Sequence, residues 1–350
     1  MSGKALKLEE LSINIPLTEG VLHAVDGISL HVDRGETLCV VGESGCGKSL
    51  TSLAIMGLLP KNAIRTMTTL ELGETNILDY SQKEMSDIRG NKMAMIFQEP
   101  MTSLNPAYSI GNQLIEAVLR HKNISKRNAR DRAVELLQKV GISDPVNRLR
   151  QFPHQLSGGL RQRVMIAMAL MCNPDLIIAD EPTTALDVTI QAQILSLLKE
   201  LQADFGMGLL LITHDMGVVA RMADRVAVMY AGQVVEQGTV HEIFDRPAHP
   251  YTRGLMRCIP VPGKIKRGEP LGTIPGIVPS LVGEFNGCRF NGRWGHPTEN
   301  SAEPSVSLAP YSEKKYSYLV EGSTNHIVRF CCDQCLANSK VVLSSDFVAH

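Results

Sequence analysis

The sequence lacks three features, and each absence narrows the class of protein. No apolar run among its 350 residues approaches the ~20 residues that a helix needs to cross a bilayer. The formal net charge of -1 provides no overall positive field of the kind that attracts nucleic acid. The first residues, MSGKALKLEE, contain no hydrophobic segment of a secretory signal. We therefore expect a cytoplasmic protein that binds no nucleic acid.

Cysteine is present, but it forms no evident disulfide framework. The eight cysteines are scattered along the chain, and in the cytosol most are expected to be reduced, buried and inert. With 44% hydrophobic and 20% charged residues, the composition is typical of a soluble globular protein. The length is sufficient for one large core and a second, smaller unit.

Predicted strands and helices alternate along most of the chain. Apolar runs such as TLCVV predict strands that are buried on both faces. This alternation indicates an α/β fold with helices on both faces of a sheet. After Asp245, proline and glycine become frequent and the periodicity fades, so we place a boundary between 1–245 and 246–350. The predicted strands are 5–15, 23–32, 37–41, 175–180, 208–213, 225–230 and 233–238, and the predicted helices lie within 48–59, 110–140, 160–172 and 188–205.

The stretch GESGCGKS, residues 42–49, follows one predicted strand and precedes a helix. It matches G-x-x-x-x-G-K-[ST], in which glycines let successive backbone N–H groups point at an anion. Lys48 is expected to reach the outer phosphates of a nucleotide, and the Ser49 hydroxyl to hold Mg²⁺. A chance glycine-rich turn is the alternative, which the strand–loop–helix context disfavours. The expected nucleotide contacts from this segment are Gly42, Glu43, Ser44, Gly45, Cys46, Gly47, Lys48, Ser49 and Leu50.

Cys46 lies inside this loop and is expected to contribute its backbone N–H. The positive charge of such a loop would lower the pKa of its thiol.

Two carboxylates and a histidine follow predicted strands. Asp180 ends a buried strand, a usual place for a carboxylate that orients Mg²⁺ through water. Glu181 is assigned to position the attacking water and to accept its proton. His214 follows another strand, at the ligand side of such a sheet, and is expected to contact the γ-phosphate. The alternatives are a solvated acidic turn and a structural histidine.

A second glycine pair lies far from the first, in LSGGLRQR. Ser157, Gly158 and Gly159 precede a predicted helix from Leu160, so they predict a second anion-binding helix N-terminus. The alternative is a loop with a C-capping glycine pair. One chain has no obvious way to close both glycine segments around one triphosphate.

These motifs occur in one order: GESGCGKS, Gln98 in IFQEP, LSGGLRQR, LIIADEP, ALD and ITHD. Together, over about residues 5–245, they resemble the ATP-binding subunit of an ATP-binding-cassette (ABC) transporter. QEPMTSLNP and HPYT resemble the dipeptide/oligopeptide importer subgroup, which includes some nickel importers. The resemblance implies a P-loop ATPase with a RecA-like core, an antiparallel β subdomain and an inserted α-helical subdomain at about 99–156. It also implies a small C-terminal extension.

The resemblance also implies roles for residues and partners. Mg²⁺ would be held through Ser49, Gln98 and Asp180. Two subunits would sit head to tail, with Ser157–Gly159 and Asp187 of one contacting ATP held by the other. ATP-driven closure of that pair would power import of di- or oligopeptides, with nickel import as the alternative.

The implied assembly contains a second ABC ATPase, which in this subgroup is usually a different chain, so a heterodimer is expected. It also contains two transmembrane permease subunits and an extracytoplasmic substrate-binding protein. This chain would be peripheral, on the cytoplasmic face of the inner membrane.

The sequence departs from the family in two places. Many members have an aromatic residue that stacks on adenine in this region, but TEGVLHAVDG contains no Phe, Tyr or Trp, and Leu22 and His23 are the nearest residues. Either the stacking is weak or His23 supplies it. In the tail, Cys288 fits the first position of a four-cysteine set that resembles an iron–sulfur site, but Trp294 occupies the second.

A later tail segment, FCCDQC, contains Cys332 and Cys335 in C-x-x-C spacing, which suits zinc or a redox pair. Cys288, Cys332 and Cys335 are thus the candidate tail ligands. A divergent tail without metal is the favoured alternative.

Two rival functions belong to other classes. A soluble ABC ATPase of translation or DNA repair usually has two cassettes or long coiled-coil insertions, and this sequence has neither. A regulatory ATP-binding module without turnover conflicts with the presence of both Glu181 and His214.

Overall fold

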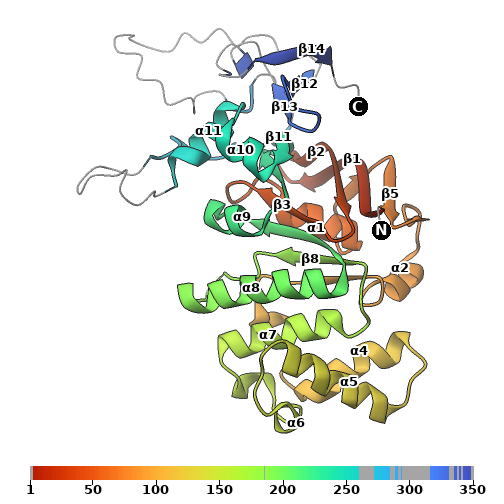
Figure 1. The fold of residues 1–350 in the computed structure, drawn as a ribbon. Helices are drawn as coiled ribbons and strands as arrows, with labels where there is room; N and C mark the ends of the chain where they lie inside the picture. The colour runs from red at the N-terminus through yellow and green to blue at the C-terminus, as the bar shows by residue number, and fades with distance from the viewer. Residues whose placement is uncertain are drawn as a thin grey trace.

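The computed structural model describes residues 3–184, 186–259, 272–283, 288–290, 293, 316–330, 335–336, 339 and 342–347. Within these ranges the chain forms two sheets, which Figure 1 shows packed above a group of helices. None of the helices in this part of the chain is long and apolar enough to cross a bilayer.

The larger sheet has the strand order β14-β12-β13-β11-β10-β3-β9-β8-β7. Its central strands are parallel, and β11 pairs with β10 in the antiparallel direction. Every residue of β3 and β9 is buried, as their continuous apolar runs predict. The strands of this sheet that precede residue 240 are β3 (Thr37–Val41), β7 (Met93–Ile96), β8 (Leu176–Asp180), β9 (Gly208–Thr213), β10 (Arg225–Tyr230) and β11 (Gln233–Thr239).

The smaller sheet is antiparallel and forms from the N-terminal part of the chain. Its path is β2-β1-β5-β6, and β4 also pairs with β1. Its core residues, among them Leu6 and Ile28, share one cluster with Leu38 and Val40 of β3. The smaller sheet therefore covers one face of the larger one. Its strands are β1 (Lys4–Leu17), β2 (Gly20–Asp33), β4 (Ile64–Thr66), β5 (Thr69–Leu72) and β6 (Thr75–Asn76).

Helices complete the covering of both faces. Helix α1 (Lys48–Met56) packs in the same cluster as the small sheet, and α2 (Gln82–Ile88) lies nearby. The opposite face, which includes Cys39 and Val41, is covered by α7 (Gly158–Leu170), α8 (Val188–Phe205) and α9 (Met216–Met222). Alternate residues of β3 thus enter different cores, which is why a strand between two layers is apolar throughout.

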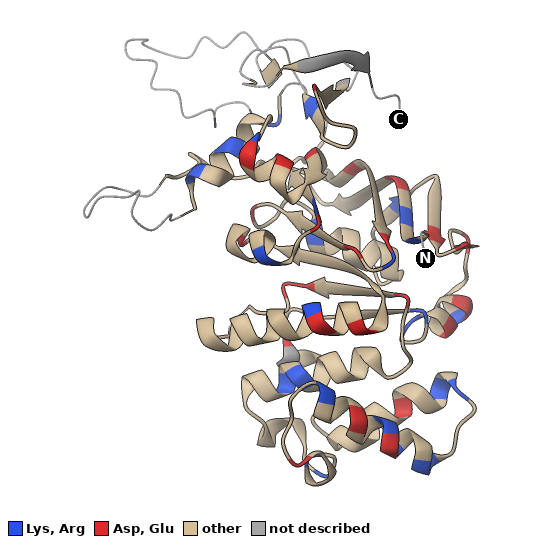
Figure 2. Ribbon diagram, in the orientation of Figure 1, with Lys and Arg blue, Asp and Glu red and all other residues tan. Residues whose placement is uncertain are grey.

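The segment between β7 and α7 is helical and lies at the bottom of Figure 1. Ser109 and Ser125 cap its two long helices by accepting hydrogen bonds from Asn112 N and Asn128 N. Figure 2 shows basic and acidic residues interspersed along these two helices. The helical elements of this segment are α3 (Pro100–Ser103), α4 (Ile110–His121), α5 (Lys126–Lys139), α6 (Pro145–Arg148) and the 3₁₀ turn Pro153–Gln155.

The described part of the C-terminal region continues the larger sheet, which the fading periodicity after Asp245 did not predict. Strand β13 pairs with β11, opposing Val328 to Glu236. The buried carboxylate of Glu236 accepts hydrogen bonds from Ala248 N and His249 N, and it contacts His326 Nε2 at 2.7 Å. The elements here are α10 (Val240–Asp245), α11 (Pro250–Arg257), β12 (Tyr316–Val320), β13 (Ile327–Phe330) and β14 (Leu343–Phe347).

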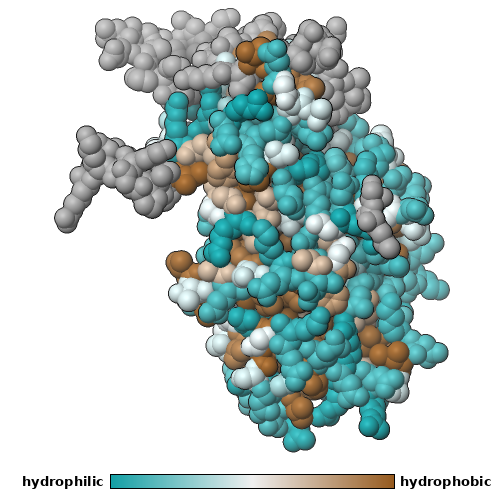
Figure 3. Space-filling model, in the orientation of Figure 1, coloured by the Kyte–Doolittle hydropathy of each residue, from teal (hydrophilic) through white to brown (hydrophobic). Residues whose placement is uncertain are grey.

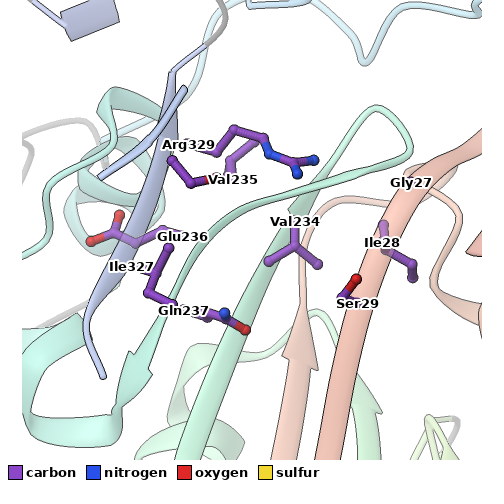
Figure 4. A pocket seen from close by; sticks show the side chains of 10 residues that line it. Gly27, Ile28, Ser29, Val234, Val235, Glu236, Gln237, Ile327 and Arg329 are labelled. Atoms are coloured by element: carbon purple, nitrogen blue, oxygen red, sulfur yellow. The ribbon is translucent and has the colours of Figure 1, made fainter. Parts of the chain in front are cut away.

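Figure 4 shows where β11 and β13 approach β2. The pocket between Ile28, Val235 and Ile327 measures only ≈ 20 Å³, room for about one water. This junction is therefore a packed contact between strands and no ligand site.

Candidate nucleotide-binding site

The loop between β3 and α1 has a conformation that requires glycine. A Cβ added at Gly42 would lie 2.1 Å from the carbonyl oxygen of Met229. Gly47 has φ +101°, and a Cβ there would lie 2.6 Å from the carbonyl oxygen of Ala24. The loop therefore packs against β2 and β10 so closely that side chains at these two positions would displace it.

Lys48 begins α1, and its ammonium group turns back into the loop. Its Nζ donates hydrogen bonds to the carbonyl oxygens of Gly42 (2.8 Å) and Glu43 (2.9 Å), and only 5% of the residue is exposed. Because both acceptors are neutral, they fix the position of the ammonium without neutralising it. An anion bound at the loop would supply the negative charge that neutralises the Lys48 ammonium.

Ser49 and Asp180 form a pair of oxygen donors next to the loop. Ser49 Oγ donates to Asp180 Oδ1 at 3.0 Å. Burial raises the pKa of Asp180, the Ser49 hydrogen bond opposes the shift, and neighbouring Glu181 adds to it. A hydroxyl and a buried carboxylate are oxygen ligands of the kind Mg²⁺ prefers, so the residues present fit that ion.

Glu181 is the centre of a polar cluster. Its Oε1 lies 3.1 Å from His214 Nδ1, and its Oε2 accepts hydrogen bonds from Gln98 Nε2 (3.1 Å) and Thr184 Oγ1 (2.9 Å). Burial favours the neutral acid, but the bonds from His214 and Thr184 outweigh it and hold the pKa of Glu181 below its ordinary value. Glu181 also has φ +45°, a strained value for a residue with a side chain. The arrangement keeps this carboxylate ionised and oriented.

A cavity of ≈ 640 Å³ unites the loop with this cluster. Predicted residues Cys46 and Asp180 do not line it, although Asp180 reaches it through Ser49. Thr184 and Leu255 line it without having been predicted. Thr184 could have been predicted from the sequence, because it follows Glu181 by only three residues and carries a hydroxyl that can donate to the carboxylate. The predicted residues along the cavity are Gly42, Glu43, Ser44, Gly45, Gly47, Lys48, Ser49, Leu50, Gln98, Glu181 and His214.

The predicted effect of the loop on Cys46 is wrong. The thiol is fully buried, and burial raises its pKa in spite of the nearby Lys48 ammonium. Desolvation disfavours the thiolate more than this one charge stabilises it.

Sequence reasoning also missed Tyr251 of α11. Its hydroxyl oxygen accepts a hydrogen bond from the backbone N–H of Glu43 at 2.9 Å, and burial raises its pKa. Tyr251 belongs to HPYT, which had served only as a marker of the subgroup. A contact between residues so far apart in the chain has no local signal.

The second glycine motif lies at the start of a helix. Ser157 is the N-cap of α7, accepting a hydrogen bond from Leu160 N, and Gly158 begins the helix. The alternative of a C-capping pair is therefore wrong. Asp187 likewise caps α8 by accepting from Ile190 N at 2.9 Å. Ser157, Gly158, Gly159 and Asp187 do not line the cavity at the loop of their own chain.

The tail cysteines are only partly within the described residues. Cys288 Sγ and Cys335 Sγ lie 3.5 Å apart, whereas Cys332 lies outside the described residues. Over the described ranges, no group of three or more His, Cys, Asp or Glu side chains is placed to hold a metal ion. The favoured prediction, a divergent tail without metal, and its alternative, a tail metal, both stay predictions.

Fold and site together define a P-loop nucleotide-binding cassette. Residues 25–184 match the family described as ABC transporter. The dimeric ATP-binding cassette MJ0796, bound to ADP and Pi, aligns with a TM-score of 0.60 and 28% identity, covering 67% of this chain and 98% of that one. The structure of cbiO1 from Clostridium perfringens aligns with a TM-score of 0.60 and 30% identity, covering 69% of this chain and 91% of that one.

A narrower match follows. Residues 235–299 match the family described as Oligopeptide/dipeptide transporter, C-terminal region. Oligopeptide transport ATP-binding protein AppD of Bacillus subtilis is 54% identical over 76% of this chain and 81% of its own length. Dipeptide transport ATP-binding protein DppD of Escherichia coli is 49% identical over 87% of this chain and 93% of its own length. The chain belongs to the ABC transporter family, as an ATP-binding subunit that hydrolyses ATP.

Proposed function

We propose that this chain powers import of di- or oligopeptides through membrane permease subunits. The names of the relatives support peptide import over nickel import or a soluble factor of translation or repair. The observation that carries the ATP-driven part is the ionised Glu181, held by His214, Gln98 and Thr184 at the mouth of the phosphate loop.

In this proposal the polar groups in and beside the cavity divide the tasks of binding and hydrolysis. Lys48 and the loop N–H groups bind the phosphates. Ser49, Asp180 and Gln98 hold Mg²⁺, which when bound neutralises charge on the phosphate oxygens. Glu181 orients the attacking water and accepts its proton, and its lowered pKa keeps it ready to do so. His214 holds Glu181 and contacts the γ-phosphate.

Ser157–Gly159 and Asp187 act on the ATP of a second subunit. Ser157, Gly158 and Asp187 are exposed and lie outside the cavity of their own chain, which leaves the N-terminus of α7 available to another nucleotide. The MJ0796 structure is dimeric. We propose a heterodimer with a different ATPase, together with two permeases and an extracytoplasmic binding protein.

The division into 1–245, with a helical subdomain at about 99–156, and 246–350 belongs to the same proposal. Among the described side chains from Phe97 to Phe152, the large apolar ones that are exposed include Phe97, Tyr108, Val146 and Phe152. Figure 3 shows brown, apolar residues exposed among the lower helices. Such a surface supports docking of this subdomain on membrane permeases, which makes the chain peripheral on the cytoplasmic face.

The test is uptake by the assembled transporter in proteoliposomes. With ATP inside, labelled di- or pentapeptide is expected to accumulate. Glu181→Gln should bind ATP normally yet abolish turnover and uptake, because it keeps the shape of the side chain and removes the base. If the transporter takes up labelled nickel in an ATP-dependent manner but takes up no peptide, the proposed substrate is wrong. If Glu181→Gln hydrolyses ATP at the wild-type rate, Glu181 is not part of the mechanism.

A further inference from the structure

A second cavity adjoins the phosphate cavity. It measures ≈ 320 Å³, and both cavities are lined by Ser44, Gly45, Gly47 and Leu50. A ligand whose phosphates are bound by the loop can therefore extend its other end directly into this second cavity.

Three distant parts of the chain surround this second cavity. The start of β2 supplies Leu22 and His23, and the turn between β10 and β11 supplies Ala231 and Gly232. The third wall is the segment 277–281, Ile-Val-Pro-Ser-Leu, from the C-terminal region. None of the described residues lining it is Phe, Tyr or Trp.

Backbone pairing holds the C-terminal segment in place. His23 N donates to the carbonyl oxygen of Leu281 at 2.9 Å, and Gly283 N donates to that of Val21 at 2.9 Å. Leu22 and Val282 form an antiparallel bridge between these bonds. The segment is thus attached to β2 by one antiparallel bridge, and this anchor fixes the residues just before it beside the loop.

Ile277 and Val278, which come just before that anchor, are apolar side chains that line the cavity and remain partly exposed. Ile277 is 86% exposed, although it lines the cavity, and Val278 is half-buried beside it. An isoleucine this exposed, held next to a phosphate-binding loop, has apolar surface that a bound ligand would cover.

We propose that Ile277 and Val278 form an aliphatic wall against which the base of the bound nucleotide packs. This proposal depends on the proposed function, since it assumes a nucleoside triphosphate on the loop. The wall takes the place of the Phe, Tyr or Trp ring that TEGVLHAVDG does not provide. The imidazole of His23, which also lines the cavity, is hydrogen-bonded to Asn14 Oδ1 at 2.8 Å. Aliphatic groups contact the face of a base and form no hydrogen bond with its edge. The wall therefore favours any purine nucleotide over bare polyphosphate and distinguishes adenine from guanine little.

The experiment compares three ligands on the full-length chain by titration calorimetry: ATP, GTP and inorganic tripolyphosphate. Ile277→Ser is expected to weaken ATP and GTP by a similar factor, roughly tenfold, and to leave tripolyphosphate unchanged. Ile277→Leu keeps the apolar surface and should retain wild-type affinity. Ile64→Ser is the matched control, because Ile64 is 55% exposed on β4 and lines neither cavity.

Two results would overturn the proposal: unchanged ATP affinity in Ile277→Ser, or an equal loss for tripolyphosphate, which would mean that the segment acts on the loop and not on the base. If the wild-type chain itself binds no ATP, the proposed function fails, which is a different result from either.

Discussion

Glu43 of the phosphate loop is held by residues that lie far away in the sequence. Arg293 donates two hydrogen bonds to its carboxylate, at 2.6 and 3.0 Å, and the side chain of Arg293 is only 5% exposed. Burial alone would lower the pKa of Arg293, but the bonds to Glu43 and Tyr230 outweigh it and raise the pKa. A bidentate pair of this kind fixes direction as well as distance. The loop is therefore clamped at Glu43 from outside its own strand and helix.

Arg293→Gln should release this clamp. We expect ATP affinity to fall about tenfold, because the loop is no longer held at Glu43 and the negative charge of the Glu43 carboxylate is left uncompensated near the phosphates. Calorimetric titration measures it. The control is Arg225→Gln, which breaks an Arg–Glu pair of similar burial with Glu36, away from the loop. Equal effects of the two variants would show general destabilisation and contradict the clamp.

Thr184→Val should change the pH dependence of turnover. The pKa of Glu181 is held low, so its ionised form persists as the pH falls. Removing the Thr184 hydrogen bond raises that pKa, so the acidic limb of the kcat profile should move to higher pH by roughly one unit. ATPase rates across pH measure it. Thr183→Val, next to it in the chain, should leave the limb in place, and a shift of equal size there would argue against the assignment.

At the scale of elements, the sequence predicted best where a strand lies between two layers. Strand β9 and helix α8 have the predicted bounds, because an unbroken apolar run and a long amphipathic repeat are local signals. The bridge of Leu22 to Val282 and the pairing of Glu236 with Val328 were not predicted. The partners are 260 and 92 residues apart in the chain, and nothing in either segment alone identifies the other.

The site divides in the same way. The loop, Glu181 and His214 come together as predicted because the carboxyl ends of neighbouring parallel strands meet at one sheet edge. Tyr251 and Arg293 were missed because they approach the loop from the C-terminal region.

The N-terminus of α7 allows a test of the two-subunit site. Ser157→Arg should abolish ATP hydrolysis while sparing nucleotide binding, because the added bulk lies outside the cavity of its own chain but at the proposed contact with the partner. The measurement is ATPase rate against the concentration of the assembled subunits, alongside an ATP titration. A rate equal to wild type at every concentration would count against a shared site.

At the scale of the whole molecule, one buried carboxylate joins the C-terminal region to the sheet. Glu236 is 1% exposed and receives the N–H groups of Ala248 and His249 while contacting His326. Three polar partners from two later segments thus depend on one side chain of β11.

Glu236→Leu should lower the free energy of unfolding by about 2–4 kcal/mol, because it leaves buried donors without an acceptor. Denaturant unfolding measures it. Glu321→Leu, exposed in the turn after β12, is the control and should change stability little. If both variants unfold at the same denaturant concentration, Glu236 does not hold this junction.

Glu43 and Arg293 are 250 residues apart. At roughly 5–20 residues per second, a ribosome needs tens of seconds to make the intervening chain. During that interval the newly made loop, already flanked by β3 and α1, lacks its arginine. If Arg293 clamps the loop as predicted above, a nascent chain acquires full affinity for nucleotide only after residues 1–245 have all been made.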